Sequence, residues 1–173
     1  MKPRRSNLSV PGHVAKMHAR AADSQADVVM LDLEDSVPFE AKEAARQQVI
    51  DSLLHLDWAK KTVTVRINGL DTAFAYRDLI AVVEQAGHVL DAIVIPKVNH
   101  EGDIHFAERL LGGIALHKGG PDNIGIEASI ETAEGLLRAS AIAQASARVQ
   151  TLVFGIADYQ TSIGARLVSI SGH

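Results

Sequence analysis

Carboxylates recur in this chain where apolar, strand-like runs end. Glu131 follows the run "IGIEASI", and Asp158 follows the run "TLVFGIA". Consecutive parallel strands of an α/β fold end at one rim, so these two carboxylates are expected to be neighbours. Neighbouring carboxylates repel unless a cation lies between them, and Mg²⁺ typically takes one or two carboxylates together with waters and substrate oxygens. The pair therefore predicts a Mg²⁺ site, which Mn²⁺ could also fill.

Further charged residues end other runs of the same kind. Asp32, Glu34 and Asp35 lie in "LDLEDS", where they are expected to hold waters that are bound to the metal. Arg66 ends "VTVR" and Lys97 follows "IVIP", so both add positive charge to the same rim. A cation, an arginine and several acids around one cavity suit a reaction that passes through an oxyanion or an enolate.

Simpler structural interpretations compete with these roles. Asp35 could cap the next helix, and Glu131 could share a capping arrangement with Thr132. Lys97 is expected to be a solvated loop residue, and Trp58 a packing anchor. The eight histidines contain no i, i+4 pair that would suggest a metal site, so nearly all are interpreted as surface or helix residues.

Strand-like and helix-like segments alternate along the chain, at about 30 residues per unit. Helical patterns cover 40–56, 75–87 and 132–146. Near-continuous apolar runs, typical of parallel strands covered on both faces, predict adjacent parallel strands, in sequence order, near 7–11, 27–33, 62–67, 92–98, 124–131 and 151–157.

Two architectures fit this alternation. A doubly wound sheet that binds nucleotides usually has a glycine-rich first turn, whereas "VPGHVAKM" has a single glycine. A (β/α)8 barrel needs about 250 residues, and this chain of 173 residues supplies six units at most. Length favours the open sheet, whereas acids at strand ends favour the barrel, whose active site lies at the carboxyl ends of its strands.

Composition excludes several classes of function. The chain is 47% hydrophobic and 22% charged, with a net charge of −4 and scattered Lys and Arg, so no nucleic-acid-binding surface is expected. It has no cysteine, which excludes disulfides and thiolate metal sites. The first residues lack the apolar segment of a secretory signal, and no run is long enough to span a membrane. A cytoplasmic protein is expected.

Six segments together resemble the citrate lyase β-subunit-like enzymes of the HpcH/HpaI aldolase superfamily, and among them the malyl-CoA, β-methylmalyl-CoA and citramalyl-CoA lyases. They are "RRSNLSVPG", "DVVMLDLEDSVPFEAKEAAR", "VTVRING", "IVIPKV", "IEASIETAEGLL" and "VFGIADYQTSIGAR". The resemblance implies an α/β, TIM-like (β/α)8 barrel, of which residues 1–173 form one partial domain with the first six units. It also implies a metal-dependent enzyme that cleaves, or forms by Claisen condensation, a 3-hydroxyacyl-CoA thioester such as malyl-CoA or citryl-CoA.

The resemblance also implies roles for individual residues. The family's two metal carboxylates fall on Glu131 and Asp158, and Asp158 is expected to lie at the substrate as well. Its arginine, which steadies the enolate and the substrate oxygens, falls on Arg66. The acids of its "LED" motif fall on Glu34 and Asp35, near the waters of the metal. The basic motif Arg4–Arg5 is expected to lie towards the CoA phosphates.

Relatives continue past "SISGH" with two more units and a C-terminal aspartate that serves as the acid–base residue of a neighbouring subunit. The resemblance therefore implies a homo-oligomer, a trimer or hexamer, that binds acyl-CoA and 2-oxo acid substrates. Residues 1–173 alone are expected to show little turnover. Two alternatives remain open: a metal-dependent 2-oxo acid aldolase that does not use CoA, and a non-catalytic fragment that only associates.

Overall fold

The computed structural model describes residues 3–119 and 123–166. The strands in this part of the chain are β1 (Asn7–Pro11), β2 (Val28–Asp32), β3 (Thr62–Arg66), β4 (Ala92–Ile95), β5 (Gly125–Ile130) and β6 (Val149–Phe154). The helices are α1 (Ala15–Ala22), the short 3-10 helix η1 (Phe39–Ala41), α2 (Lys42–His55), α3 (Ala75–Ala86), α4 (Glu101–Lys118), α5 (Ala133–Leu137), α6 (Ala139–Gln144) and α7 (Ile156–Ser162).

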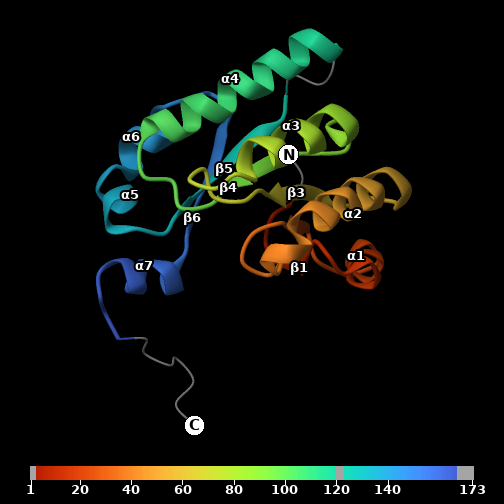
Figure 1. Cartoon of the computed structure of the whole chain (residues 1–173), viewed down its shortest axis with the longest axis horizontal. Coiled ribbons are helices and arrows are strands. Elements are labelled where there is room, and N and C mark those ends of the chain that lie inside the picture. The colour runs from red at the N-terminus through yellow and green to blue at the C-terminus, as the bar shows by residue number, and fades with distance from the viewer. Residues whose placement is uncertain (1–2, 120–122, 167–173) are drawn as a thin grey trace.

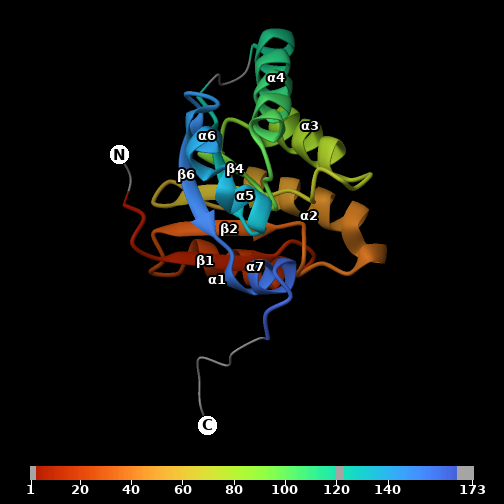
Figure 2. The same cartoon turned by 90° about the vertical axis from the view of Figure 1, so that its left-hand side faces the viewer.

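The six strands form one parallel sheet in the order β1-β2-β3-β4-β5-β6, which confirms the predicted order. The order does not reverse at any point, so the doubly wound alternative is wrong. Each strand is followed by a helix, and α1 to α4 lie beside one another along one face of the sheet (Figures 1 and 2). The arrangement is that of six consecutive units of a TIM-like barrel.

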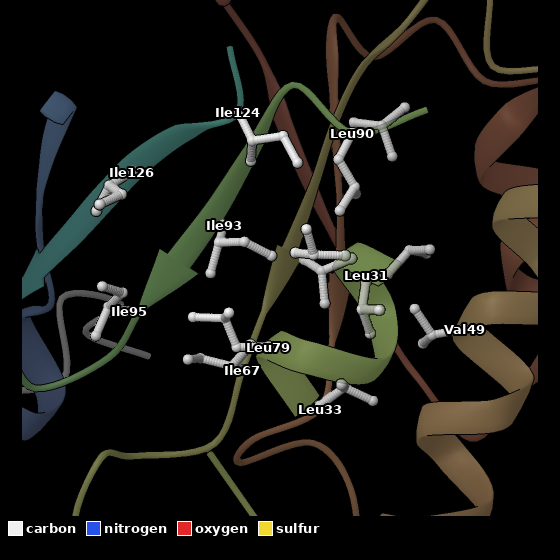
Figure 3. Packing of buried hydrophobic residues seen from close by; sticks show 14 of the residues in the cluster. Leu31, Leu33, Val49, Ile67, Leu79, Leu90, Ile93, Ile95, Ile124 and Ile126 are labelled. Atoms are coloured by element: carbon white, nitrogen blue, oxygen red, sulfur yellow. The ribbon is translucent and has the colours of Figure 1, made fainter. Parts of the chain in front are cut away.

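The hydrophobic core lies between the sheet and these helices. Side chains alternate between the two faces of a strand, so Leu31, Ile93 and Ile126 point to the helices (Figure 3). They pack with Val49 of α2 and Leu79 of α3, and all five are at most 1% exposed. This layer fixes the strands beneath the rim.

The opposite face of the sheet is also buried and mixes polar with apolar side chains, because Ala92 and Val94 lie in register with Thr64 and Glu127. Thr64, Glu127 and Ser129 alternate with the core residues along β3 and β5, and they are 0%, 1% and 3% exposed. Hydroxyl and carboxyl groups therefore line part of the interior of the sheet's curve.

Several element boundaries differ from the sequence-based expectations. The helix expected over 132–146 is divided at Arg138 into α5 and α6, and α4 has no counterpart among the predicted helices. Strand β6 ends at Phe154, so Asp158 lies in the first turn of α7 and does not end a strand. No helix in the described part of the chain is long and apolar enough to cross a membrane.

Candidate active site

The carboxyl ends of β2 and β3 place Asp32 and Arg66 side by side, as paired residues of the sheet. Arg66 donates from Nε to Asp32 Oδ1 (2.7 Å) and from Nη2 to Asp32 Oδ2 (2.8 Å). Burial acts to raise the pKa of Asp32, but the hydrogen bonds and charge of Arg66 outweigh it and hold that pKa below its usual range. This bidentate pair fixes the plane of the guanidinium.

Asp32 also organises the loop that follows it. Its Oδ1 accepts from the N–H of Glu34 (2.9 Å), and its Oδ2 accepts from the N–H (3.1 Å) and hydroxyl (2.5 Å) of Ser36. Lys42 donates from Nζ to the carbonyl oxygens of Leu33 (2.8 Å) and Glu34 (2.6 Å). The "LED" loop is therefore held from within the sheet and from α2.

Glu34 is only 6% exposed and lies between two cations. Its Oε1 accepts from Lys97 Nζ (2.7 Å), and its Oε2 is ion-paired with Arg66 Nη1 (3.1 Å). Burial is the main cause of its raised pKa, and the two cations offset only part of that effect. Asp35 is more exposed, at 3.7 Å from Lys97 Nζ and 4.0 Å from Arg66 Nη1.

Glu131 directly follows β5 and is 5% exposed. Its Oε2 accepts from the backbone N–H of Lys97 (3.1 Å). Gly155, the residue after β6, lies very close to the Glu131 side chain: a Cβ placed at Gly155 would lie 2.6 Å from Glu131 Oε1. Burial raises the pKa of Glu131, the charge of Asp158 raises it further, and the Lys97 N–H opposes the shift. A buried carboxylate with a raised pKa beside a second carboxylate is a site that a cation would stabilise.

Asp158 reaches the same rim from α7, with a side chain that is 40% exposed and an Oδ2 atom 4.0 Å from Lys97 Nζ. Among the described residues there is no group of three or more acids or histidines that could hold a metal ion. Mg²⁺ typically takes only one or two protein carboxylates and keeps several waters. Glu131 and Asp158 are compatible with that mode of binding.

Several competing interpretations can now be judged. Asp35 caps no helix, because η1 and α2 begin after Pro38 and Ala41. Thr132 caps α5 with its own hydroxyl, which accepts from the N–H of Gly135 (3.0 Å). Lys97 lies in a loop and its side chain is 38% exposed, as expected, but its ammonium is also ion-paired with buried Glu34.

Two further expectations concern the helices. Trp58 is confirmed as a packing anchor: it is 5% exposed, and its Nε1 donates to the carbonyl oxygen of Ser52 (3.0 Å). His18 belongs to α1, as a helix residue, but it is fully buried. Its ring nitrogens lie 2.7 Å from Ser52 Oγ and 3.0 Å from the carbonyl oxygen of Pro11. Burial is the main reason that its pKa is lowered.

Arg4 and Arg5 lie at the amino ends of the strands, opposite the acid-lined rim. Arg5 donates from Nε (2.9 Å) and Nη2 (2.8 Å) to the carboxylate of Asp27, which immediately precedes β2. Arg4 is ion-paired with Glu127 inside the sheet's curve. The structure therefore does not bring these arginines to Glu131, and both have carboxylate partners.

The residues that hold the loop after β3 were not predicted from the sequence. Asp78 of α3 is fully buried and accepts from the N–H (3.0 Å) and the side-chain amide (2.6 Å) of Asn68. Its other oxygen accepts from Arg46 Nε (2.7 Å). No pattern within one segment reveals this network, because it joins α2, α3 and a loop. Gly155 was also missed, although a glycine at the end of a strand can mark close approach of another group.

A cavity of about 580 Å³ opens beside the rim. Its lining includes Glu34, Lys97, Asn68 and the ring of Phe74. Phe74 meets Phe39 edge to face, with ring centroids 5.4 Å apart. The charged rim is thus continuous with a larger space that has an aromatic wall.

Comparison with known proteins identifies the family. The family model of HpcH/HpaI aldolase/citrate lyase matches residues 5–169. The chain belongs to this family. An L-malyl-CoA/β-methylmalyl-CoA lyase of Cereibacter sphaeroides is 43% identical over 171 residues, which cover 99% of this chain and 54% of that protein. A malyl-CoA/β-methylmalyl-CoA/citramalyl-CoA lyase of Chloroflexus aurantiacus is 34% identical, over 99% of this chain and 50% of that protein.

Solved structures of the family have the same arrangement of elements. A citrate lyase β subunit from Mycobacterium tuberculosis, complexed with oxaloacetate and magnesium, gives a TM-score of 0.73 at 30% identity, over 95% of this chain and 65% of that one. The protein CitE of the same organism, in complex with magnesium, acetoacetate and coenzyme A, gives a TM-score of 0.74 at 30% identity, over 95% of this chain and 54% of that one. The chain spans about half the length of the curated relatives that it matches.

Proposed function

We propose that this chain carries the metal-binding and substrate-orienting part of a carbon–carbon lyase for 3-hydroxyacyl-CoA thioesters, such as malyl-CoA, β-methylmalyl-CoA, citramalyl-CoA or citryl-CoA. The observation that carries the proposal is the buried carboxylate of Glu131, whose pKa is raised by burial and by Asp158 beside it. The lyases and magnesium-bound structures among the relatives support the same reaction class.

Glu131 and Asp158 are the residues that would hold Mg²⁺, and Mn²⁺ is an alternative. When bound, the ion supplies Lewis-acid polarisation of the 2-oxo acid carbonyl. The Lys97 N–H holds one oxygen of Glu131, and Gly155 leaves room for the other beside β6. Asp32, Glu34 and Asp35 lie near enough to the rim to orient bound water, but Asp32 and Glu34 are already ion-paired.

Arg66 is proposed to steady the negative charge that develops on the thioester oxygen during cleavage. Burial acts to lower the pKa of Arg66, but Asp32 and Glu34 raise it overall, so the side chain stays charged. Asp32 takes the Nε and Nη2 donors, which orients Nη1 along the rim towards Glu34 and Asp35. A fixed donor of this kind stabilises an enolate without reorganising during the reaction.

The proton transfer needs a group within about 2.6–3.2 Å of the substrate hydroxyl. We do not assign this role to Asp32 or Glu34, because each carboxylate is engaged by a cation. In the family that the chain resembles, a C-terminal aspartate has this role, and residues 1–173 are proposed to bind substrate groups better than they turn them over.

Self-association is part of the proposal. Within the described residues, β1 and β6 form the two edges of the sheet, and each pairs with one strand only. Unpaired edges favour pairing with another strand. We propose a homo-oligomer, and light scattering of the purified chain would test it: a monomer at all concentrations would contradict it.

The direct test of the function is binding of glyoxylate, pyruvate and oxaloacetate to residues 1–173 with and without Mg²⁺, for the wild type and Arg66→Gln. We expect oxo acid binding to require Mg²⁺. In a catalytically active protein that contains this chain, Arg66→Gln should lower kcat by about 10²–10³-fold. Arg66→Lys is the matched control, because lysine keeps the positive charge but lacks the planar guanidinium with its paired donors. Equal binding of the oxo acids after chelation of all divalent ions would contradict the proposal.

Release of acetyl-CoA from malyl-CoA and citramalyl-CoA distinguishes a lyase for CoA thioesters from an aldolase that acts on free acids. Cleavage restricted to CoA-free hydroxy-oxo acids would favour the aldolase alternative. Turnover by residues 1–173 at the rate of a full-length relative would mean that the proton-transfer group lies within this chain.

A further inference from the structure

The acids of the rim form two groups on different strands. Asp32, Glu34 and Asp35 follow the end of β2 and are called the β2 acids, whereas Glu131 and Asp158 are called the β5–β6 acids. Arg66 is ion-paired with all three β2 acids. In the part of the chain that the structure describes, Lys97 alone has ion pairs with members of both groups.

Lys97 reaches both groups because its two ends point in different directions. Its backbone N–H donates to Glu131 Oε2 (3.1 Å). Its ammonium donates to Glu34 Oε1 (2.7 Å) and lies 4.0 Å from Asp158 Oδ2. One residue thus contacts a carboxylate that follows β2, one that follows β5 and one on α7.

The backbone of Lys97 has an uncommon conformation. Its φ of +51° is the only positive φ of a non-glycine residue in the described part of the chain. Residues other than glycine rarely adopt this conformation, and it persists where surrounding contacts require it. A glycine would adopt it more easily, so the choice of lysine here points to a use for the side chain.

We propose that Lys97 is the positioning residue that couples the two acid groups, and this inference rests on the proposed function for its role towards substrate. The N–H orients Glu131, and the ammonium takes one oxygen of Glu34. The second oxygen of Glu34 is ion-paired with Arg66. Because Lys97 holds the first oxygen, Glu34 cannot move further onto the guanidinium of Arg66. Arg66 then keeps donor capacity for an oxo acid or thioester oxygen.

Removal of the ammonium changes this balance. Glu34 is buried, so an oxygen without a partner is unfavourable, and the carboxylate is expected to move fully onto Arg66. The loop of the β2 acids would open more often, and Arg66 would bind substrate oxygens less well. The backbone N–H remains in every side-chain variant, so Glu131 should be affected less.

Three variants of residues 1–173 separate these effects. Lys97→Met removes the charge at similar length, Lys97→Arg keeps it, and Lys97→Gly removes it while relieving the positive φ. The first readout is amide hydrogen exchange of Glu34, Ser36 and Val37, whose N–H groups are bonded within the loop. Amide exchange in α1 is the internal control. Exchange in the loop and in α1 can both be measured without a metal.

We expect Lys97→Met and Lys97→Gly to raise exchange in the loop about tenfold, with Lys97→Arg within about threefold of wild type. In the presence of Mn²⁺, Lys97→Met should weaken oxo acid binding about tenfold, and Lys97→Arg should restore it. Loss of stability alone would raise exchange in α1 as well, and Lys97→Arg would not correct it.

Unchanged loop exchange in Lys97→Met would overturn the inference. So would unchanged oxo acid affinity in a Lys97→Met protein that still binds Mn²⁺. If the wild type binds neither Mn²⁺ nor an oxo acid, the proposed function fails, and the metal-free exchange experiment still decides whether Lys97 couples the acid groups.

Discussion

The two ends of the sheet use charge in different ways. At the amino ends, Arg5 is matched with Asp27, and Arg4 with Glu127. At the carboxyl ends, four of the five carboxylates of the β2 and β5–β6 acids share the cations Arg66 and Lys97, and the fifth, Glu131, accepts from the backbone N–H of Lys97. The paired charges at the amino ends join segments, whereas the five acids at the carboxyl ends outnumber these two cations. This contrast supports the proposal that the carboxyl ends of the strands bind a cation.

The largest expected effect comes from the network beneath the rim. Asp78→Ala removes one of the two carboxylate partners of buried Arg46 and the single oxygen that accepts both hydrogen bonds from Asn68, so the free energy of unfolding should fall by about 3–5 kcal/mol. Urea denaturation followed by circular dichroism measures it. Exposed Glu84 lies on the same helix, and Glu84→Ala should change stability by no more than about 0.5 kcal/mol. Equal effects of the two substitutions would show that the network does not support the rim.

A smaller and more local effect is expected at Gly155. A Cβ there would lie 2.4 Å from Glu131 Cγ, so Gly155→Ala should displace the carboxylate. Loss of one well-placed ligand should weaken Mn²⁺ binding about 100-fold, since supporting changes at metal sites typically cost 10–100-fold. The matched control is Gly113→Ala in α4, where nothing lies within 4 Å of the added Cβ and stability should rise by about 0.5–1 kcal/mol. Mn²⁺ affinity that is unaffected by Gly155→Ala would separate Glu131 from the metal site.

The third prediction concerns His18, which binds the carbonyl oxygen of Pro11 at the carboxyl end of β1. Because its pKa is lowered in the folded state, the unfolded chain binds the proton more readily. The stability that neutral His18 contributes is present above the unfolded pKa of about 6.5, and it is lost as the pH falls from there through the folded value. Thermal unfolding of wild type and His18→Gln between pH 8 and pH 5 should show a steeper fall for wild type. Parallel curves would contradict this prediction.

The smallest effect, and the sharpest test of the contrast between the two ends, is a carboxyl titration of the metal-free protein by NMR. The hydrogen bond from Arg5 lowers the pKa of Asp27 to about 2, whereas burial raises the pKa values of Glu34 and Glu131. The stability that Asp27 contributes is therefore lost as the pH falls from about 4 towards 2. For Glu34 and Glu131 the sign is opposite, because stability falls as the pH rises through the pKa values of these groups in the folded protein. Glu34 and Glu131 values at or below those of ordinary glutamates would remove the electrostatic difference between the two ends.

Much of the fold was predictable because its signals are local. Apolar runs gave the positions of all six strands, and acids after those runs marked the rim. Helix α4 escaped prediction: its sequence contains Gly112 and Gly113, which weaken the helical pattern, while tertiary packing of residues such as Ile104 supports it. The place of Asp158 in α7 was also missed, because a strand-like run continued past Gly155.

The contacts within the site were less predictable than its members. The left-handed backbone of Lys97 and the approach of Gly155 to Glu131 depend on segments far apart in the chain. The arginines of the amino-terminal motif have carboxylate partners at the amino ends of the strands, and their place near CoA phosphates stays a prediction. Residue type indicated charge, and only the fold showed which charges meet.

The assignment of Glu131 and Asp158 as metal ligands is tested most directly by calorimetric titration of Mn²⁺ into residues 1–173. The proteins compared are the wild type, Glu131→Gln, Asp158→Asn and the exposed control Glu84→Gln. We expect one Mn²⁺ site in the wild type and in Glu84→Gln. We also expect binding at least about 100-fold weaker in Glu131→Gln, and a weakened site in Asp158→Asn. Mn²⁺ affinity that is the same in all four proteins would contradict the assignment of the acid-lined rim as a metal site.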